Sequence, residues 1–202
     1  LDRYQERRFT QSHQKTPSFG FTTSEYWFAL ELKKSPSDDK ERLLQVAYAP
    51  LDHIEVFLVS NDELILHETM GDTQSFARRP TANRNFIVPL NFRHNQNHIL
   101  LFKVQQFDGD VVEVPVQILQ QSAFTQSEIR ASLFDGAFIG IMLIMGIYNL
   151  FLFAYLRDPA YLAYVVYVFS AAVFVAAIEG WAFQYIWPTH PSVQKNCFPA
   201  LV

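Results

Sequence analysis

Trp27 has the chemistry to hold a sugar ring. A sugar-binding site needs an aromatic platform for the apolar face of the ring, and it needs polar side chains for the hydroxyls, which are costly to bury unpaired. Trp27 fits the platform because it alternates with a set of apolar residues and therefore points to the opposite face of its predicted strand. The alternative is that Trp27 belongs to the core and that the other face is solvated. Gln105 and Phe107, at the end of a later strand, are secondary candidates.

Arg79, Arg84 and Asn85 are the candidate polar groups of the same site. A guanidinium presents a rigid fork of donors that suits carboxylates or paired hydroxyls. The structural alternative is that these side chains bond loop carbonyls and fix the turn before the strand that starts at Phe86. The sequence leaves both interpretations open.

The sequence predicts no metal centre, no cofactor and no catalytic site. Its six histidines lack the close pairing with carboxylates that metal sites show. His94 and His98 are four residues apart, but a turn is predicted between them. The segment Asp108–Gly109–Asp110 could contribute to a calcium site, but a hairpin turn explains it better. No nucleophile elbow, phosphate-binding loop or zinc-protease motif occurs. A membrane-anchored glycan hydrolase is the enzymatic alternative, and it would need two facing carboxylates that a sequence cannot reveal.

The charged residues are concentrated in the first two thirds of the chain. Of 36 Asp, Glu, Lys and Arg residues, 31 lie in residues 1–132 and five lie in residues 133–202. The formal net charge of −4 argues against nucleic-acid binding, which usually needs a basic face. The uneven distribution of charged residues indicates that residues 1–132 face water and that residues 133–202 face lipid.

Residues 1–122 have the pattern of an all-β domain. Tyr26, Phe28, Leu30 and Leu32 alternate with residues that point to the other face. Further short segments rich in β-branched or aromatic residues are separated by turn-forming clusters, which predicts a β-sandwich or jelly roll. The predicted strands are 25–33, 43–48, 54–59, 64–67, 86–92, 99–105 and 111–119.

Residues 136–156 and 159–178 form two candidate membrane spans. Neither segment carries a formal charge, and each is long enough to cross a hydrocarbon core of roughly 30 Å. Only Arg157 and Asp158 separate them, which predicts a helical hairpin with a tight turn. A pair of buried helices in a soluble protein is the alternative, but the preceding 132 residues could not easily wrap both. Aromatic residues typical of membrane interfaces flank the spans at Tyr155, Tyr161, Trp181, Tyr185 and Trp187.

Three residues of the first span are predicted to pack against other helices. Gly136 and Gly140 form a G-x-x-x-G spacing that lets a second helix approach closely. Asn149 is expected to form an interhelical hydrogen bond, because polar groups in lipid usually face the bundle interior. Glu179, at the aromatic end of the second span, is either solvated at the interface or functional.

A stalk helix is expected to join the two parts of the chain. Thr125 and Glu128 fit a capping box, in which each side chain satisfies a free backbone amide. We expect the helix to start there, to form a stalk over residues 123–132, and to run unbroken into the first span.

Several segments together are characteristic of one bacterial receptor family. They are Phe19–Phe21, Tyr26–Leu30, Ala49–Leu58, Arg79–Leu90, Gly146–Phe153, Arg157–Tyr164 and Gly180–Pro188. On these segments the chain resembles the seven-transmembrane receptors with diverse intracellular signalling modules, in the form that carries a β-sandwich extracellular region.

This resemblance implies a periplasmic jelly roll similar to carbohydrate-binding domains, followed by seven membrane helices. Residues 133–202 would hold two full spans and the beginning of a third, and a cytoplasmic diguanylate cyclase or histidine kinase would follow. The sandwich would lie outside the inner membrane, with the turn at Arg157 in the cytoplasm.

We therefore expect a sensor and not an enzyme. Its partners would be a glycan or a similar polar ligand, and membrane lipid. The alternative is a module for dimerisation or protein docking that binds no small molecule and forms a homodimer.

Overall fold

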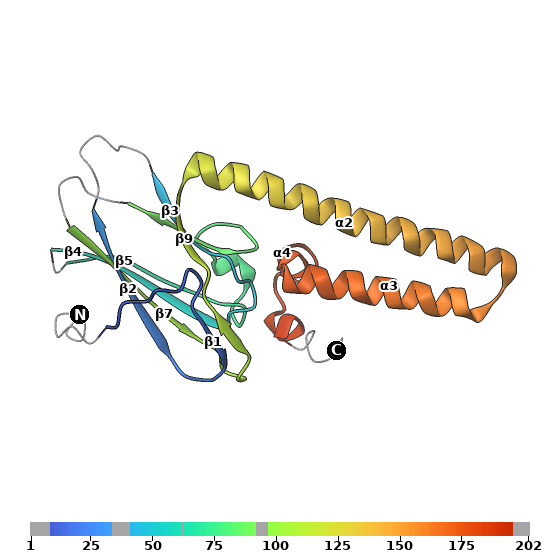
Figure 1. Cartoon of the computed structure of the whole chain (residues 1–202), viewed down its shortest axis with the longest axis horizontal. Coiled ribbons are helices and arrows are strands. Elements are labelled where there is room, and N and C mark those ends of the chain that lie inside the picture. Colours follow the sequence, from blue (N-terminus) through green and yellow to red (C-terminus); the bar gives the residue numbers. More distant parts are fainter. Residues whose placement is uncertain (1–8, 34–40, 62, 92–96, 196–202) are drawn as a thin grey trace.

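The computed structural model describes residues 9–33, 41–61, 63–91 and 97–195. A sheet-rich part is followed by a long helical hairpin that extends away from it (Figure 1). The turn-forming segment at 35–39 between the first two predicted strands, residue His94 and the predicted start of a third span lie outside the described residues.

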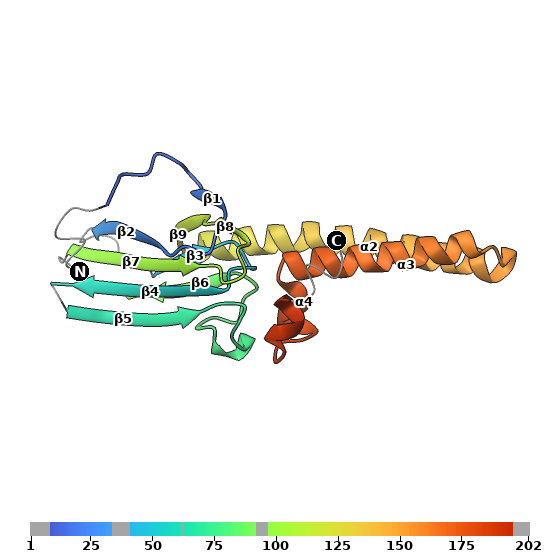
Figure 2. The ribbon, with the colours of Figure 1, turned by 90° about the horizontal axis from the view of Figure 1, so that it is seen from below.

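The strands form two main sheets and one short pair. Figure 2 shows the four strands of the first sheet side by side. This sheet has the order β2-β7-β4-β5, made of Tyr26–Lys33, Asn97–Gln105, His53–Ser60 and Glu63–Met70. The second sheet has the order β6-β3-β9, made of Phe86–Leu90, Arg42–Val46 and Val116–Gln120. The pair consists of β1 (Ser18–Phe21) and β8 (Val111–Glu113), and a short 3-10 helix, η1, spans Phe76–Arg78.

The core lies between the two main sheets and confirms the predicted β-sandwich. Inward side chains of both sheets are fully buried in one cluster, including Leu44 of β3 and Val56 of β4. Phe28 stacks on Phe102 at 4.8 Å between ring centroids. The apolar set of β2 packs against this cluster, as its alternation predicts.

Two features of the sandwich differ from the predicted strands. The single strand predicted at 111–119 is divided, because β8 pairs with β1 whereas β9 pairs with β3. Pro115 lies at the break, where it removes a backbone donor from the ladder. Strand β1 was not predicted, because it is only four residues long and Gly20 adopts a left-handed φ of 67°.

Helices α2 (Gln121–Leu156) and α3 (Pro159–Ile178) form the predicted hairpin. Arg157 ends α2 in a left-handed conformation, and the Asp158 carboxylate caps α3 by accepting a hydrogen bond from the Ala160 amide. Both helices are long and apolar enough to cross a membrane, and each contains an 18-residue stretch with a mean hydropathy of 2.2. Helix α3 brings the chain back to the sandwich, and the short helix α4 (Trp181–Tyr185) follows directly at its end (Figure 1).

The predicted capping box is wrong. Helix α2 begins four residues earlier, at Gln121, and the Thr125 hydroxyl donates to the Gln121 carbonyl within the helix. The reason is tertiary: Phe124 is buried in a small cluster with Leu43 and Ile87, which holds the first helical turn against the sandwich. The helix nevertheless runs unbroken into the first span, as predicted.

The contacts between α2 and α3 differ from those predicted. In this hairpin the Asn149 side-chain amide donates to the Met145 carbonyl of its own helix, and an interhelical hydrogen bond of Asn149 stays a prediction. The close approach occurs at Gly146, where an added Cβ would lie 3.2 Å from the Phe169 ring. Within the described part of the chain, a Cβ added at Gly136 or Gly140 would meet no atom within 4 Å. Their packing against further helices stays a prediction.

Candidate functional sites

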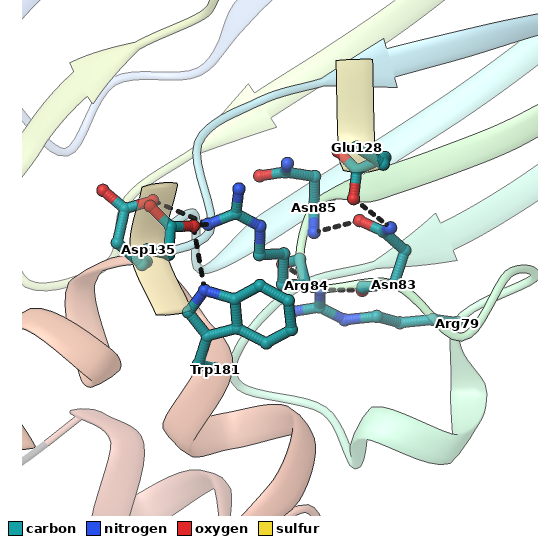
Figure 3. Close-up of polar contacts among 8 residues, drawn as sticks. Arg79, Asn83, Arg84, Asn85, Glu128, Asp135 and Trp181 are labelled. Atoms are coloured by element: carbon teal, nitrogen blue, oxygen red, sulfur yellow. Dashed lines mark hydrogen bonds and ion pairs between the residues drawn. The ribbon is translucent and has the colours of Figure 1, made fainter. Parts of the chain in front are cut away.

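Arg84 joins the sandwich to both membrane helices. Its guanidinium nitrogen lies 2.7 Å from Asp135 Oδ2 on α2 and 2.8 Å from Glu179 Oε2 at the end of α3. The guanidinium carbon also lies 4.8 Å from the ring centroid of Trp181, and the Trp181 indole donates to Asp135 (Figure 3). One buried cation therefore touches α2, α3 and α4 at the same time. We call Arg84, Asp135, Glu179 and Trp181 the junction.

The loop between η1 and β6 carries Arg84, and Gly180 makes the close approach possible. Gly180 has a φ of 79°, and an added Cβ would lie 2.8 Å from the Ala49 methyl group and 3.0 Å from the Arg84 carbonyl oxygen. An L side chain would therefore be strained and would also meet the sandwich backbone. The corner between α3 and α4 seats directly on the loop that presents Arg84.

Arg79 has a structural position beside the junction. Its guanidinium donates to the Asn83 and Arg84 carbonyls, and it lies 4.3 Å from the Phe86 ring centroid. Burial lowers the pKa of Arg79 to about 10, and the Asp72 carboxylate opposes this shift. The side chain thus stays a cation and orders the turn, which agrees with the structural alternative.

Two asparagines complete the loop. Asn83 donates to Glu128 Oε2 of α2 at 2.7 Å, and its own side-chain oxygen accepts from the Asn85 amide at 2.8 Å (Figure 3). Glu128 therefore serves as an anchor between helix and sandwich instead of a helix cap. Asn85 takes part in this loop through its backbone.

Trp27 lies on the outer face of the first sheet, 43% exposed. Its ring stacks at 6.0 Å on Phe57 of β4, which in turn stacks at 4.5 Å on His67 of β5. The ammonium group of Lys103 lies 5.9 Å from the Trp27 ring centroid. The alternative in which Trp27 belongs to the core is excluded, since the apolar set of β2 fills the core instead. We call Trp27, Phe57 and His67 the aromatic row.

Glu55 is the polar centre beside the aromatic row. Its carboxylate contacts His53 at 2.8 Å, His67 at 3.6 Å, and the Lys103 ammonium group. Burial alone would raise the pKa of Glu55, but the hydrogen bonds from His53 and Lys103 outweigh it and lower the pKa to about 2. The outer face therefore carries a fixed negative charge that neighbouring donors hold in place.

We expect Glu55→Gln to remove a contribution to folding stability that is present at neutral pH and lost in acid. Because the folded pKa of about 2 lies below the ordinary 4.5, the contribution is present above about pH 4.5 and is lost as the pH falls through 2. It amounts to at most about 3 kcal/mol. The midpoint of thermal unfolding of the 202-residue chain in detergent should fall less steeply in the variant as the pH is lowered from about 6 to about 3. Glu63→Gln, an exposed change on β5, is the matched control and should leave the slope unaltered.

The structure separates the six predicted ligand residues into two groups. Gln105 pairs with His53 in the ladder and shares the outer face with Lys103 and Trp27, because side chains two apart point the same way. Phe107, 46% exposed, lies next to His53 with ring centroids 5.9 Å apart. Arg79, Arg84 and Asn85 belong to the junction region.

Several residues of these sites escaped the sequence analysis. Phe57 and Glu55 alternate on β4 with buried residues, so strand parity would assign them to an outer face. Nothing in the sequence shows that β4 lies two strands from β2 in the sheet, with β7 between them. Asp135 offered a signal, since it is a lone carboxylate near the start of an apolar span.

Two family models match the chain. The model described as 7TMR-DISM extracellular 2 matches residues 2–120, and the model described as 7TM diverse intracellular signalling matches residues 131–202. Both describe sensor and receptor regions and not enzymes. No curated protein matches the sequence.

Proposed function

This chain belongs to the 7TMR-DISM receptor family, and from that premise we propose that its sandwich binds a carbohydrate-like ligand and passes the signal to the membrane helices through Arg84. The chain holds an extracellular sensor region and membrane-region sequence of a transmembrane signalling receptor. The sandwich would be a jelly roll. A jelly roll has eight strands in two sheets. If β8 and β9 are taken as one interrupted strand, they connect β1 to β3 and β6 in one sheet of order β1-β8/β9-β3-β6. The other sheet has the order β2-β7-β4-β5, and this pair of orders supports the jelly-roll topology.

The aromatic row supports a ligand with one apolar and one polar side. Trp27 presents an exposed ring face, and Glu55, Lys103 and Gln105 place acceptors and donors beside it. Stacking on the ring combined with hydrogen bonds to planar polar groups suits a sugar. Arg79 and Arg84 are already engaged at the junction, so the proposal does not use them for the ligand.

The bridge from Arg84 to Asp135 and Glu179 is the observation that carries the signalling proposal. A ligand can change a receptor only if it binds two states with different affinity. A buried cation shared by the sandwich and by two helices gives these states a physical basis, because moving the loop must break or shift two ion pairs. The sandwich would face the periplasm, with the Arg157 turn in the cytoplasm of an inner-membrane receptor. A cyclase or a histidine kinase would provide the output.

Trp27→Ala should weaken glycan binding about 5- to 150-fold, because loss of a stacking platform removes about 1–3 kcal/mol. The measurement is a glycan array followed by calorimetry on the 202-residue chain in detergent. Leu64→Ala, which truncates another exposed apolar side chain on β5, is the matched control and should bind normally.

Two outcomes would contradict the ligand proposal. A folded chain that binds no member of broad glycan classes would overturn it, and so would equal weakening by both variants. Concentration-dependent self-association measured by sedimentation, without glycan binding, would favour the alternative of a dimerisation or docking module.

A further inference from the structure

Two buried carboxyl groups meet at the base of the sandwich. Asp52 precedes β4 and Asp72 follows β5, and their side chains lie close enough to interact. They are only 5% and 3% exposed. Among the described residues, the Asp72 Oδ1 atom is buried without a hydrogen-bond partner. Neither residue was singled out by its sequence context, and neither belongs to the aromatic row or to the junction.

Backbone contacts hold Asp52 tightly in place. Its carboxylate accepts a hydrogen bond from the Phe107 amide at 2.6 Å, and its carbonyl accepts one from the Thr73 hydroxyl at 2.8 Å. Gly71 packs so closely that an added Cβ would lie 1.9 Å from the Asp52 carbonyl oxygen. Asp52 therefore cannot move away from Asp72 without disturbing the loop around it.

The charges that face the pair do not neutralise both carboxylates. Arg79 and Lys195 lower the pKa of Asp72, whereas burial and Asp52 raise it more strongly. Arg79 is engaged with backbone carbonyls, and Lys195 forms an ion pair with Asp108 at 2.6 Å. Two neighbouring buried carboxylates cannot both ionise cheaply. Burial, followed by the neighbouring Asp52, raises the pKa of Asp72 to about 8.

The segment after Asp72 leads directly to the membrane side of the molecule. The Phe76 amide donates to the Pro188 carbonyl at 3.0 Å, and the Phe76 ring meets Phe183 of α4 edge-on at 5.7 Å. Arg79 also lies 5.5 Å from the Phe183 ring centroid. A displacement at Asp72 would therefore be passed to α4 through segment 72–79, which ends seven residues after Asp72.

We propose that Asp52 and Asp72 form a proton-sharing pair that makes the seating of the sandwich on α4 respond to the pH outside the cell. With the proton bound, the pair closes and segment 72–79 packs against Phe183 and Pro188. When the proton leaves, two adjacent negative charges repel, and the segment loosens from α4. The receptor thereby acquires a second input besides its ligand.

The direction of the effect follows from the raised pKa. Between the ordinary pKa of 3.8 and about 8, the folded chain holds a proton that the unfolded chain releases, so stability falls as the pH rises through this range. Loosening of segment 72–79 itself should be centred near pH 8, where the folded pair loses its proton.

The test combines infrared spectroscopy and hydrogen exchange on the 202-residue chain in detergent. We expect a protonated-carboxyl band that persists at neutral pH and disappears near pH 8. After correction for intrinsic rates, amides of 72–79 and 181–188 should exchange about tenfold faster above this midpoint than below it. Asp72→Asn, which stays neutral at every pH, should abolish both the band and the change in exchange. Asp52→Asn should do the same, and it preserves the test if the first variant fails to fold.

Asp110→Asn, an exposed change in the neighbouring loop, is the matched control and should retain both transitions. A carboxyl band that disappears below pH 5 together with the exposed carboxylates would overturn the shared proton. A band that titrates near pH 8 without any change in exchange at 181–188 would overturn the coupling to the helices.

Discussion

Arg84→Met should loosen the sandwich from both membrane helices and lower the stability of the chain by about 2 kcal/mol. Methionine retains the packing of the aliphatic stem, but it leaves the Asp135 and Glu179 carboxylates facing each other without a cation. Loss of a fully buried pair would cost more, but both carboxylates are partly exposed and water screens them. The midpoint of thermal unfolding in detergent should fall by about 6 °C.

Hydrogen exchange separates loss of the junction from general destabilisation. Amides of 181–187 should exchange about tenfold faster in Arg84→Met, while those of the sandwich core strands stay protected. Arg78→Met is the matched control, because Arg78 is an exposed arginine six residues before Arg84, at the end of η1. Equal behaviour of the two variants would show that the Arg84 bridge does not hold the helices to the sandwich.

Gly180→Ala should destabilise the same interface from the opposite side, by about 2–3 kcal/mol. The alanine would have to keep a φ of 79° and would place its methyl group 3.0 Å from the Arg84 carbonyl oxygen. Either the α3–α4 corner moves away or the Arg84 loop shifts, and both changes lengthen the ion pair with Glu179. The expected result is a lower unfolding midpoint together with faster exchange at 181–187.

Gly140→Ala provides the control for this substitution. Gly140 lies within a helix, and an added Cβ would meet nothing within 4 Å among the described residues. Alanine favours a helix over glycine by roughly 0.5–1 kcal/mol, so this variant should be as stable as the unaltered chain or more stable. A Gly180→Ala chain as stable as Gly140→Ala would contradict the close approach at the corner.

The two parts of the chain were predictable because they depend on local patterns. Alternation in β2 identified an apolar set and placed Trp27 on the opposite face, and the structure shows that the apolar set fills the core. The uncharged stretches separated by Arg157 and Asp158 identified the hairpin and its turn. Both predictions follow from side-chain periodicity and from the solvent that each segment must face.

Contacts between distant segments were not predictable in the same way. A guanidinium suits paired acceptors, which makes Arg84 a candidate ligand group in the sequence, but in the structure its acceptors are Asp135 and Glu179. The capping box failed for the same reason, since Glu128 binds Asn83, 45 residues away, instead of a neighbouring amide. A local motif competes with every partner that the fold brings near, and these partners are set by sheet order and loop geometry.

The residue types alone determined a β-sandwich followed by two apolar helices, with Trp27 on the strand face opposite the apolar set. Only the tertiary structure decided which polar groups meet. It placed Arg84 between two helices, Glu55 beside the aromatic row, and Asp52 against Asp72. Periodicity is a property of neighbours along the chain, whereas an ion pair or a shared proton depends on distances of a few ångströms between segments that only the folded core aligns.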